Sequence, residues 1–294
     1  MDLEGAKEEL RNKGYTIIRN VLEEEEINEY KSEFVKWLDS VENLREVHNM
    51  VDFNGIFKHH EVGNQRFAWL VRTNPKIINI FKELWGVDEL VTSFDGCCYY
   101  PKDYVGQERY WTHSDQSSRK KGVYCYQSFV SLTDNSERTL QVYEGTNLCH
   151  EKYFEEMNID EPRDWNIIDE DYIKQYEDKK RILSVNAGDL VVWESRTFHQ
   201  NLCGSTDCNE ERLIQYLCYL PKEREGNTER EQRYRKRYFE TRRTTSHWPY
   251  PMNVVPLQPN AYNYYNEGNE IYINYEYLPR PELDDLMEKI EVLL

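Results

Sequence analysis

The chain has 294 residues, of which 31% are charged, and its formal net charge is −17 at pH 7. An acidic surface of this kind argues against general binding to nucleic acid and against docking on anionic membranes, because both carry negative charge. The N-terminus lacks a basic-then-apolar signal pattern, and no run approaches the roughly 18 apolar residues of a membrane helix. We therefore expect a cytoplasmic protein with one large domain or two small ones.

The cysteines and tyrosines are unusual in number. Seven cysteines form no disulfide-framework spacing, so reduced thiols are expected, and a zinc site at Cys203 and Cys208 would lack two further ligands nearby. Many of the 23 tyrosines gather between residues 262 and 277. Two interpretations stay open for them, a compositional bias of the source genome and an aromatic surface that covers a site.

Apolar periodicity and turn residues predict the elements of the first hundred residues. Glycines at the helix ends and Pro101 after the last strand set the boundaries. The predicted order is a helix over 4–14, a strand over 15–22, helices over 23–39 and 76–85, and a strand over 91–100.

The middle of the chain shows short apolar runs separated by turn residues, which predict strands at 111–115, 122–133, 140–143, 182–185, 189–194 and 212–220. An acidic, polar segment with helical fragments interrupts them as an insertion at about residues 147–181. Many strands, with histidines far apart in the sequence, favour a mainly β fold with flanking helices. The expected architecture is a double-stranded β-helix, that is, a jelly roll or cupin-like barrel.

The expected domain comprises residues 1–221, including the N-terminal helices and the insertion. Residues 222–294 are expected as a C-terminal extension packed on the same domain. A helix-like basic run over 222–243 has two interpretations, a solvated amphipathic helix or arginines that face an anionic substrate. A terminal helix is predicted over 281–294.

His113 and Asp115 are the candidate metal ligands of the first motif. Residues i and i+2 of a strand point to the same face, so the two side chains would project side by side. His199, from a distant strand, would add a second imidazole. Two imidazoles and one carboxylate on one side of a metal leave positions open, as non-heme Fe(II) oxygenases require, whereas zinc favours closed tetrahedral sites.

Arg212 opens the next predicted strand. A dicarboxylate cosubstrate could chelate iron at one end and pair with this guanidinium at the other. The tripeptide His59-His60-Glu61 has a similar ligand spacing, but it lies in a polar stretch and is expected on a loop or helix surface. His247 is expected to be structural.

Four stretches together resemble the phytanoyl-CoA dioxygenase family of Fe(II)/2-oxoglutarate-dependent oxygenases. The resemblance covers most of residues 10–221. It rests on residues 14–22 with 26–27, on 84–86 with 93–96, on Trp111-Thr112-His113-Ser114-Asp115-Gln116, and on 188–193 through His199-Gln200-Asn201.

The resemblance implies a role for each matching residue. His113, Asp115 and His199 match the iron ligands, and Arg212 matches the arginine that binds the distal carboxylate of 2-oxoglutarate. Asn201 and Gln127 are further candidates for contact with this cosubstrate. Two departures stand out: residues 140–147 replace a Gly-rich strand of many members, and the spacing from His199 to Arg212 is longer than usual.

The resemblance implies a dioxygenase that uses Fe(II), 2-oxoglutarate and O2 to hydroxylate a small-molecule substrate. Asp115 favours hydroxylation, because related halogenases replace this carboxylate with a small residue. Two alternatives are a non-catalytic jelly-roll protein that binds a metal or a small acid, and a zinc hydrolase. The sequence selects no substrate among lipids, amino-acid derivatives and specialised metabolites, and it indicates no oligomeric state.

Overall fold

The computed structural model describes residues 2–51, 54–257, 264–266, 269–271 and 273–294. Part of the Tyr-rich segment between residues 262 and 277 lies outside these ranges, and with it the expectation of an aromatic cover. Among the described residues, no helix is long and apolar enough to cross a membrane.

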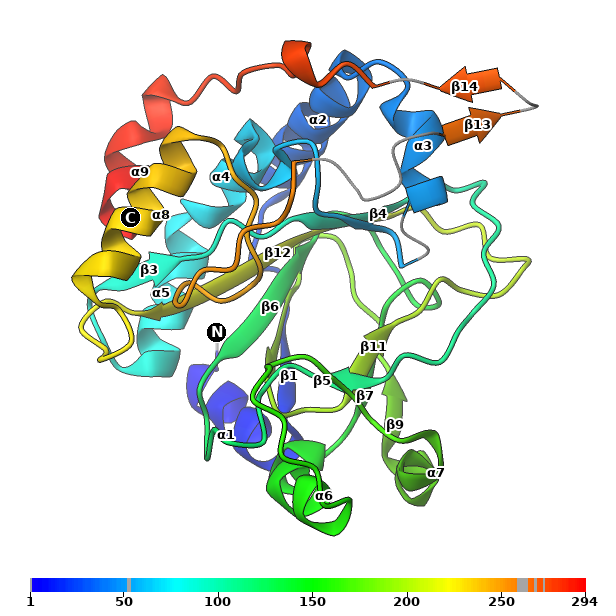
Figure 1. Cartoon of the computed structure of the whole chain (residues 1–294), viewed down its shortest axis with the longest axis vertical. Coiled ribbons are helices and arrows are strands. Elements are labelled where there is room, and N and C mark those ends of the chain that lie inside the picture. Colours follow the sequence, from blue (N-terminus) through cyan, green and yellow to red (C-terminus); the bar gives the residue numbers. More distant parts are fainter. Residues whose placement is uncertain (1, 52–53, 258–263, 267–268, 272) are drawn as a thin grey trace.

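Two antiparallel sheets face each other and form the body of the protein (Figure 1). The larger sheet has the order β1 (Tyr15–Ile18), β10 (Leu190–Glu194), β6 (Tyr126–Ser131), β12 (Arg212–Pro221), β4 (Cys97–Tyr100) and β2 (Ile56–Phe57), with β3 (Leu90–Thr92) also paired to β12. The smaller sheet has the order β8 (Asn166–Ile167), β5 (His113–Ser114), β11 (His199–Asn201), β7 (Leu140–Tyr143) and β9 (Lys180–Ile182). A separate hairpin joins β13 (Tyr264–Asn266) to β14 (Asn269–Ile271). The facing sheets make a jelly roll, which confirms the predicted fold class.

The long strand β12 shows how the sequence separates the two faces of the larger sheet. Leu213 and Leu217 join the apolar cluster under the helices, whereas Ile214 joins an inner cluster with Phe129 and Trp193. Side chains alternate along a strand, so every second residue of β12 points between the sheets. Arg212 therefore points to the same inner side as Ile214.

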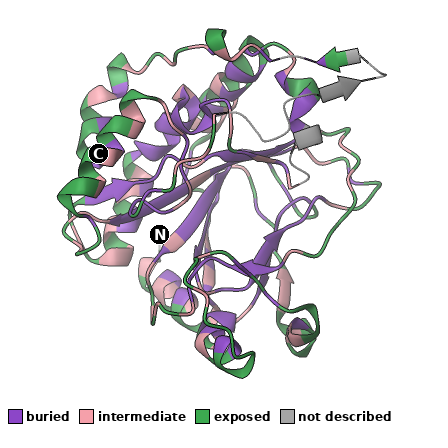
Figure 2. Ribbon diagram, in the orientation of Figure 1, coloured by how far each residue is buried: buried purple, intermediate pink, exposed green. Residues whose placement is uncertain are grey.

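Helices cover the outer face of the larger sheet, and their contact surface is buried (Figure 2). They are α1 (Leu3–Lys13), α2 (Glu24–Ser40), α3 (Leu44–Val51), α4 (Arg66–Arg72), α5 (Pro75–Trp85), α8 (Glu229–Glu240) and α9 (Met287–Leu293). Two more, α6 (His150–Glu156) and α7 (Glu170–Ile173), lie beside the smaller sheet. Short 3₁₀ turns occur at Val62–Asn64, Thr146–Leu148, Lys174–Lys179, Tyr275–Tyr277 and Asp284–Leu286.

Several elements differ from the sequence-based expectation. The strand predicted over 91–100 is two strands, β3 and β4, which pair with successive parts of β12 on either side of residues 93–96. The strand predicted over 122–133 begins only at Tyr126, and the one over 182–185 is displaced to β9. Helix α4 was not predicted, since its residues from Phe67 to Arg72 are all buried and show no amphipathic period.

The insertion and the extension both contact the strands. Within the insertion, β8 pairs with β5, with Asn166 opposite Ser114. After β12 the chain returns to the turn between β3 and β4, where the Thr245 backbone donates to the Phe94 carbonyl. The insertion therefore borders the strand that carries His113, whereas the extension borders the turn between β3 and β4.

Candidate metal centre

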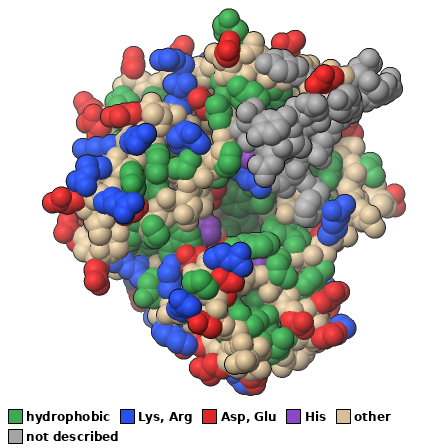
Figure 3. Space-filling view, in the orientation of Figure 1, with side chains coloured by type: hydrophobic (Ala, Val, Ile, Leu, Met, Phe, Trp, Pro, Cys, Tyr) green, Lys and Arg blue, Asp and Glu red, His purple; other side chains and the backbone are tan. Residues whose placement is uncertain are grey.

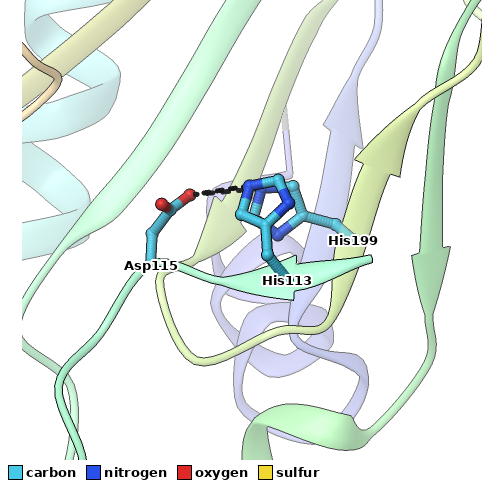
Figure 4. Close-up of side chains that lie close together, drawn as sticks. All are labelled: His113, Asp115 and His199. Carbon is cyan, nitrogen blue, oxygen red and sulfur yellow. Dashed lines mark ion pairs between the residues drawn. The ribbon is translucent and has the colours of Figure 1, made fainter. Parts of the chain in front are cut away.

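His113, Asp115 and His199 converge between the two sheets (Figure 4). One ligand atom of each lies within 4.8 Å of the others, and all three residues are buried. Nε2 of His113 is 3.5 Å from Oδ2 of Asp115, and Nε2 of His199 is 3.3 Å from the same oxygen. Bonds of about 2.0–2.2 Å to one metal ion place ligand atoms at roughly such separations. The three side chains could hold a metal ion and leave its opposite side open.

Strand pairing explains this convergence. β5 and β11 are antiparallel neighbours, and His113 is the direct partner of His199. Asp115 lies just beyond β5, where its backbone N–H donates to the Ser195 carbonyl over 2.8 Å. The expected strand over 111–115 is thus shorter than predicted, but the side-by-side arrangement of His113 and Asp115 is present.

Backbone carbonyls set the orientation of both imidazoles. Nδ1 of His113 is 3.0 Å from the Trp111 carbonyl, and Nδ1 of His199 is 2.8 Å from the Thr197 carbonyl. A carbonyl only accepts, so each Nδ1 carries the proton and each Nε2 keeps a lone pair directed at the centre. Metal-binding histidines typically have this arrangement, in which one ring nitrogen binds the metal and the other donates a hydrogen bond to a carbonyl or a carboxylate.

The charges at the centre also suit a cation. Burial by itself would raise the pKa of Asp115, but the nearby His113 and His247 and the close contacts with His113 and His199 hold that pKa well below its usual range. Burial, followed by the neighbouring His113, lowers the pKa of His199. A charged carboxylate and a neutral imidazole are the forms that bind metal.

Gln127, a sequence-based candidate for cosubstrate contact, touches the carboxylate of Asp115. Its amide nitrogen on β6 donates to Oδ2 of Asp115 over 2.9 Å. The side chain therefore orients a candidate ligand from the opposite sheet.

Arg212 lies beside the centre and is 1% exposed. Its Nη2 donates to Oδ1 of Asn201 over 2.9 Å, and Nδ2 of Asn201 donates to the Tyr216 hydroxyl over 2.6 Å. Burial raises the pKa of Tyr216 well above its ordinary value, so its phenol stays protonated. The side-chain amide of Asn201 thus contacts both the Arg212 guanidinium and the Tyr216 phenol. Together the three side chains form a site next to the triad that is rich in hydrogen-bond donors.

A cavity of about 270 Å³ opens over the triad, and histidine side chains border the hollow in the space-filling view (Figure 3). Besides the triad, its walls include Asp95, Gln127, Asn201, Tyr216, His247 and the indoles of Trp111, Trp165 and Trp193. Arg212 is not among the residues that line this cavity, but its guanidinium contacts Asn201, which does line it. The cavity therefore adjoins both the candidate metal ligands and the donor-rich site.

Sequence reasoning missed several cavity residues, among them Asp95, Trp165, Tyr216 and His247. Asp95 lies in one of the four stretches that resemble the family, and this resemblance is the sequence signal that could have identified it. Trp165 comes from the insertion and carried no signal. His247, expected to be structural, lines the cavity, and its buried Nε2 has no hydrogen-bond partner among the described residues.

The tripeptide His59-His60-Glu61 lies outside the cavity over the triad, but His60 and Glu61 are buried, so the expected surface position was wrong for these two residues. The carboxylate of Glu61 accepts two hydrogen bonds from Arg242 of the C-terminal extension. Nδ1 of His59 contacts the Pro256 carbonyl over 2.9 Å. Neither side chain lines the cavity over the triad.

Comparison with known proteins finds one matching family model and a related protein of similar length. The family model "Phytanoyl-CoA dioxygenase (PhyH)" matches residues 10–203. "Ava biosynthesis cluster protein O" of Aspergillus versicolor is 27% identical over 267 residues, which are 83% of this chain and 85% of that protein.

Solved structures share the fold at low sequence identity. The epimerase SnoN, in complex with Fe3+, alpha ketoglutarate and nogalamycin RO, aligns with a TM-score of 0.51 and 19% identity, over 74% of this chain and 83% of SnoN. The non-heme monooxygenase ThoJ aligns with a TM-score of 0.51 and 20% identity, over 76% and 78% of the two chains. A hypothetical protein from Escherichia coli reaches a TM-score of 0.62 at 13% identity, over 85% and 78%.

Proposed function

The chain belongs to the phytanoyl-CoA dioxygenase family of Fe(II)- and 2-oxoglutarate-dependent oxygenases, and we propose that it hydroxylates a small-molecule substrate. Its cofactors are Fe(II) and 2-oxoglutarate, with O2 as the oxidant. The observation that carries the proposal is the buried cluster of His113, Asp115 and His199 beneath a cavity.

In this proposal the cluster holds the iron through Nε2 of each histidine and one oxygen of Asp115. Bound iron with 2-oxoglutarate supplies the activation of O2 for attack on a substrate C–H bond. The contribution of the chain is positional: the carbonyls of Trp111 and Thr197 orient the imidazoles, and Gln127 orients the carboxylate.

Arg212 is proposed to bind the distal carboxylate of 2-oxoglutarate, with Asn201 and Tyr216 beside it. A guanidinium forms short, charge-assisted hydrogen bonds to a carboxylate. Asn201 already contacts the guanidinium, and the Tyr216 hydroxyl has no acceptor for its proton among the described residues. Asn201 and Tyr216 thus line the cavity over the triad, and Arg212 lies directly behind Asn201 in hydrogen-bond contact with it.

Hydroxylation is the proposed outcome because Asp115 supplies a carboxylate where related halogenases have a small residue. SnoN, which shares the fold, is an epimerase, so the product has to be measured. The extension over 222–294 is proposed to belong to the same domain, since Thr245, Ser246 and His247 help to line the cavity.

Succinate formation from 2-oxoglutarate tests the proposal. Metal-free protein is supplied with Fe(II) or with Zn(II), under air and under nitrogen. We expect succinate only with Fe(II) and O2, and none from Asp115→Ala, while Asp103→Ala, a change at an exposed residue, matches the wild type. Equal turnover with zinc, or turnover without O2, would favour a hydrolase. Binding of Fe(II) and 2-oxoglutarate without turnover on any of a broad panel of metabolites would favour a binding protein.

A further inference from the structure

Asp95 places a second carboxylate in the cavity over the triad. It lies in the turn between β3 and β4, and its Oδ1 accepts a hydrogen bond from the Gly96 backbone over 2.7 Å. Across the described ranges of the chain, no other group donates to this carboxylate, and no cationic side chain lies within ion-pair distance of it. One side of the carboxylate is therefore available to a molecule in the cavity.

The nearest buried cation does not neutralise Asp95 directly. Arg72, which is fully buried, donates to the backbone carbonyls of Gly63 and Asp95 and not to the carboxylate. Burial raises the pKa of Asp95 to about 7, the Gly96 hydrogen bond and Arg72 oppose this rise, and Asp115 adds to it. A carboxylate in this environment is stabilised in its charged form by a cation that binds beside it.

The rest of the cavity also suits a cation attached to an apolar body. Trp111 and Trp165 present indole rings, and the Trp165 ring centre is 5.8 Å from that of His113. Indole faces attract cations and pack against apolar groups. Ile56 and Val255 supply further apolar surface.

The charge of the whole protein acts in the same direction. A net charge of −17 favours the approach of cationic molecules over anionic ones. Lys58 also borders the cavity, but its side chain is exposed, where water and salt screen its charge.

We propose that the substrate is a small organic amine whose protonated nitrogen binds the carboxylate of Asp95. Its apolar or aromatic part lies along Trp165, Ile56 and Val255, so Asp95 is a specificity-determining residue. This inference rests on the proposed oxygenase function, because it assigns the cavity over the triad to the substrate.

Equilibrium binding of a matched pair of probes tests the inference without turnover. Phenethylamine and 2-phenylethanol have similar shape and differ in charge. Each is titrated calorimetrically into protein loaded with Ni(II) and 2-oxoglutarate under nitrogen. We expect the amine to bind at least roughly tenfold more tightly, the scale of a hydrogen bond between charged groups.

The variant Asp95→Asn removes the charge but keeps an Oδ1 acceptor for the Gly96 N–H. We expect its affinity for phenethylamine to fall to that for the alcohol, with the alcohol affinity unchanged. Asp88→Asn, which removes one exposed carboxylate outside the cavity, should behave as the wild type.

Three results would overturn the inference: equal affinities of the wild type for amine and alcohol, an unchanged preference in Asp95→Asn, or no saturable amine binding up to the solubility limit. The comparison of amine with alcohol uses the wild-type protein, so it tests the inference even if Asp95→Asn does not fold. Metal and 2-oxoglutarate binding are measured on the same samples. Loss of both would contradict the proposed function, whereas their presence without amine preference would contradict the amine inference alone.

Discussion

The amide nitrogen of Gln127 lies 2.9 Å from Oδ2 of Asp115 and donates a hydrogen bond to it. The same oxygen faces Nε2 of both His113 and His199, at 3.5 and 3.3 Å. Gln127 belongs to the larger sheet, whereas the strands of the two histidines belong to the smaller one. One hydrogen bond thus connects the two sheets at the candidate metal centre and orients the carboxylate of Asp115.

Replacing Gln127 by leucine should weaken Fe(II) binding. The change keeps the side-chain size but removes the donor to Asp115, and loss of such a supporting contact typically costs roughly 10- to 100-fold in metal affinity. Anaerobic titration with Fe(II) measures the effect. Gln175→Leu, at an exposed glutamine, is the control. Unchanged iron affinity together with weaker 2-oxoglutarate binding would instead support the cosubstrate contact that the family resemblance suggests.

Arg212→Ala should weaken 2-oxoglutarate binding by about 1.5–3 kcal/mol, the scale for hydrogen bonds to charged groups. Arg212→Lys should bind with intermediate affinity, because it keeps the charge but loses the planar fork of donors. Calorimetric titration of the metal-loaded protein measures both.

Arg119→Ala controls for the loss of a positive charge, since Arg119 is an exposed partner of Asp160. A thermal melt of each variant separates weaker binding from unfolding. Wild-type affinity in a folded Arg212→Ala protein would show that another cation binds the cosubstrate.

Arg242→Ala should destabilise the fold by roughly 1–3 kcal/mol, because it leaves the Glu61 carboxylate without its two hydrogen bonds. The Glu61 side chain is only 8% exposed, whereas that of Arg242 is 27% exposed, so water compensates for part of the loss. Urea unfolding measures the change. The double variant Glu61→Gln with Arg242→Ala should recover some stability, and no difference between wild type and Arg242→Ala would contradict a structural role for this ion pair.

Three buried histidines outside the cavity should make stability fall in mild acid. Burial lowers the pKa of His48 and of His150 from 6.5 to about 4, and that of His60 to about 3. Between the unfolded and the folded value the unfolded chain binds more protons than the folded one, so the free energy of unfolding decreases as pH falls, by about 1.4 kcal/mol per pH unit for each histidine. Above the unfolded pKa none of the three histidines contributes.

Urea unfolding of metal-free protein across this window measures the slope. His48→Gln should reduce the slope of unfolding free energy against pH by about 1.4 kcal/mol per pH unit, which corresponds to one proton, whatever the change does to the absolute stability. An unchanged slope would show that His48 takes up its proton in the folded protein as readily as in the unfolded chain.

Local sequence patterns predicted a large part of this protein. The strands over 212–220 and 140–143 follow from apolar runs between turn residues, and the structure has strands there, β12 and β7. The pair His113 and Asp115 was visible because the spacing of two residues lies within one short segment. Their roles as iron ligands, like that of Arg212, remain proposals that the experiments above test.

The tertiary structure decided what local patterns cannot contain. The pairing of His113 with His199 depends on the register between two strands that are far apart in the sequence. Cavity-lining polar residues follow no helical or strand period, so local pattern did not distinguish His247 from a structural residue, and the family-like stretch that contains Asp95 gave this residue no role. The contact of Gln127 with Asp115 arises only when the two sheets face each other, because neither strand alone determines which side chains meet across the core.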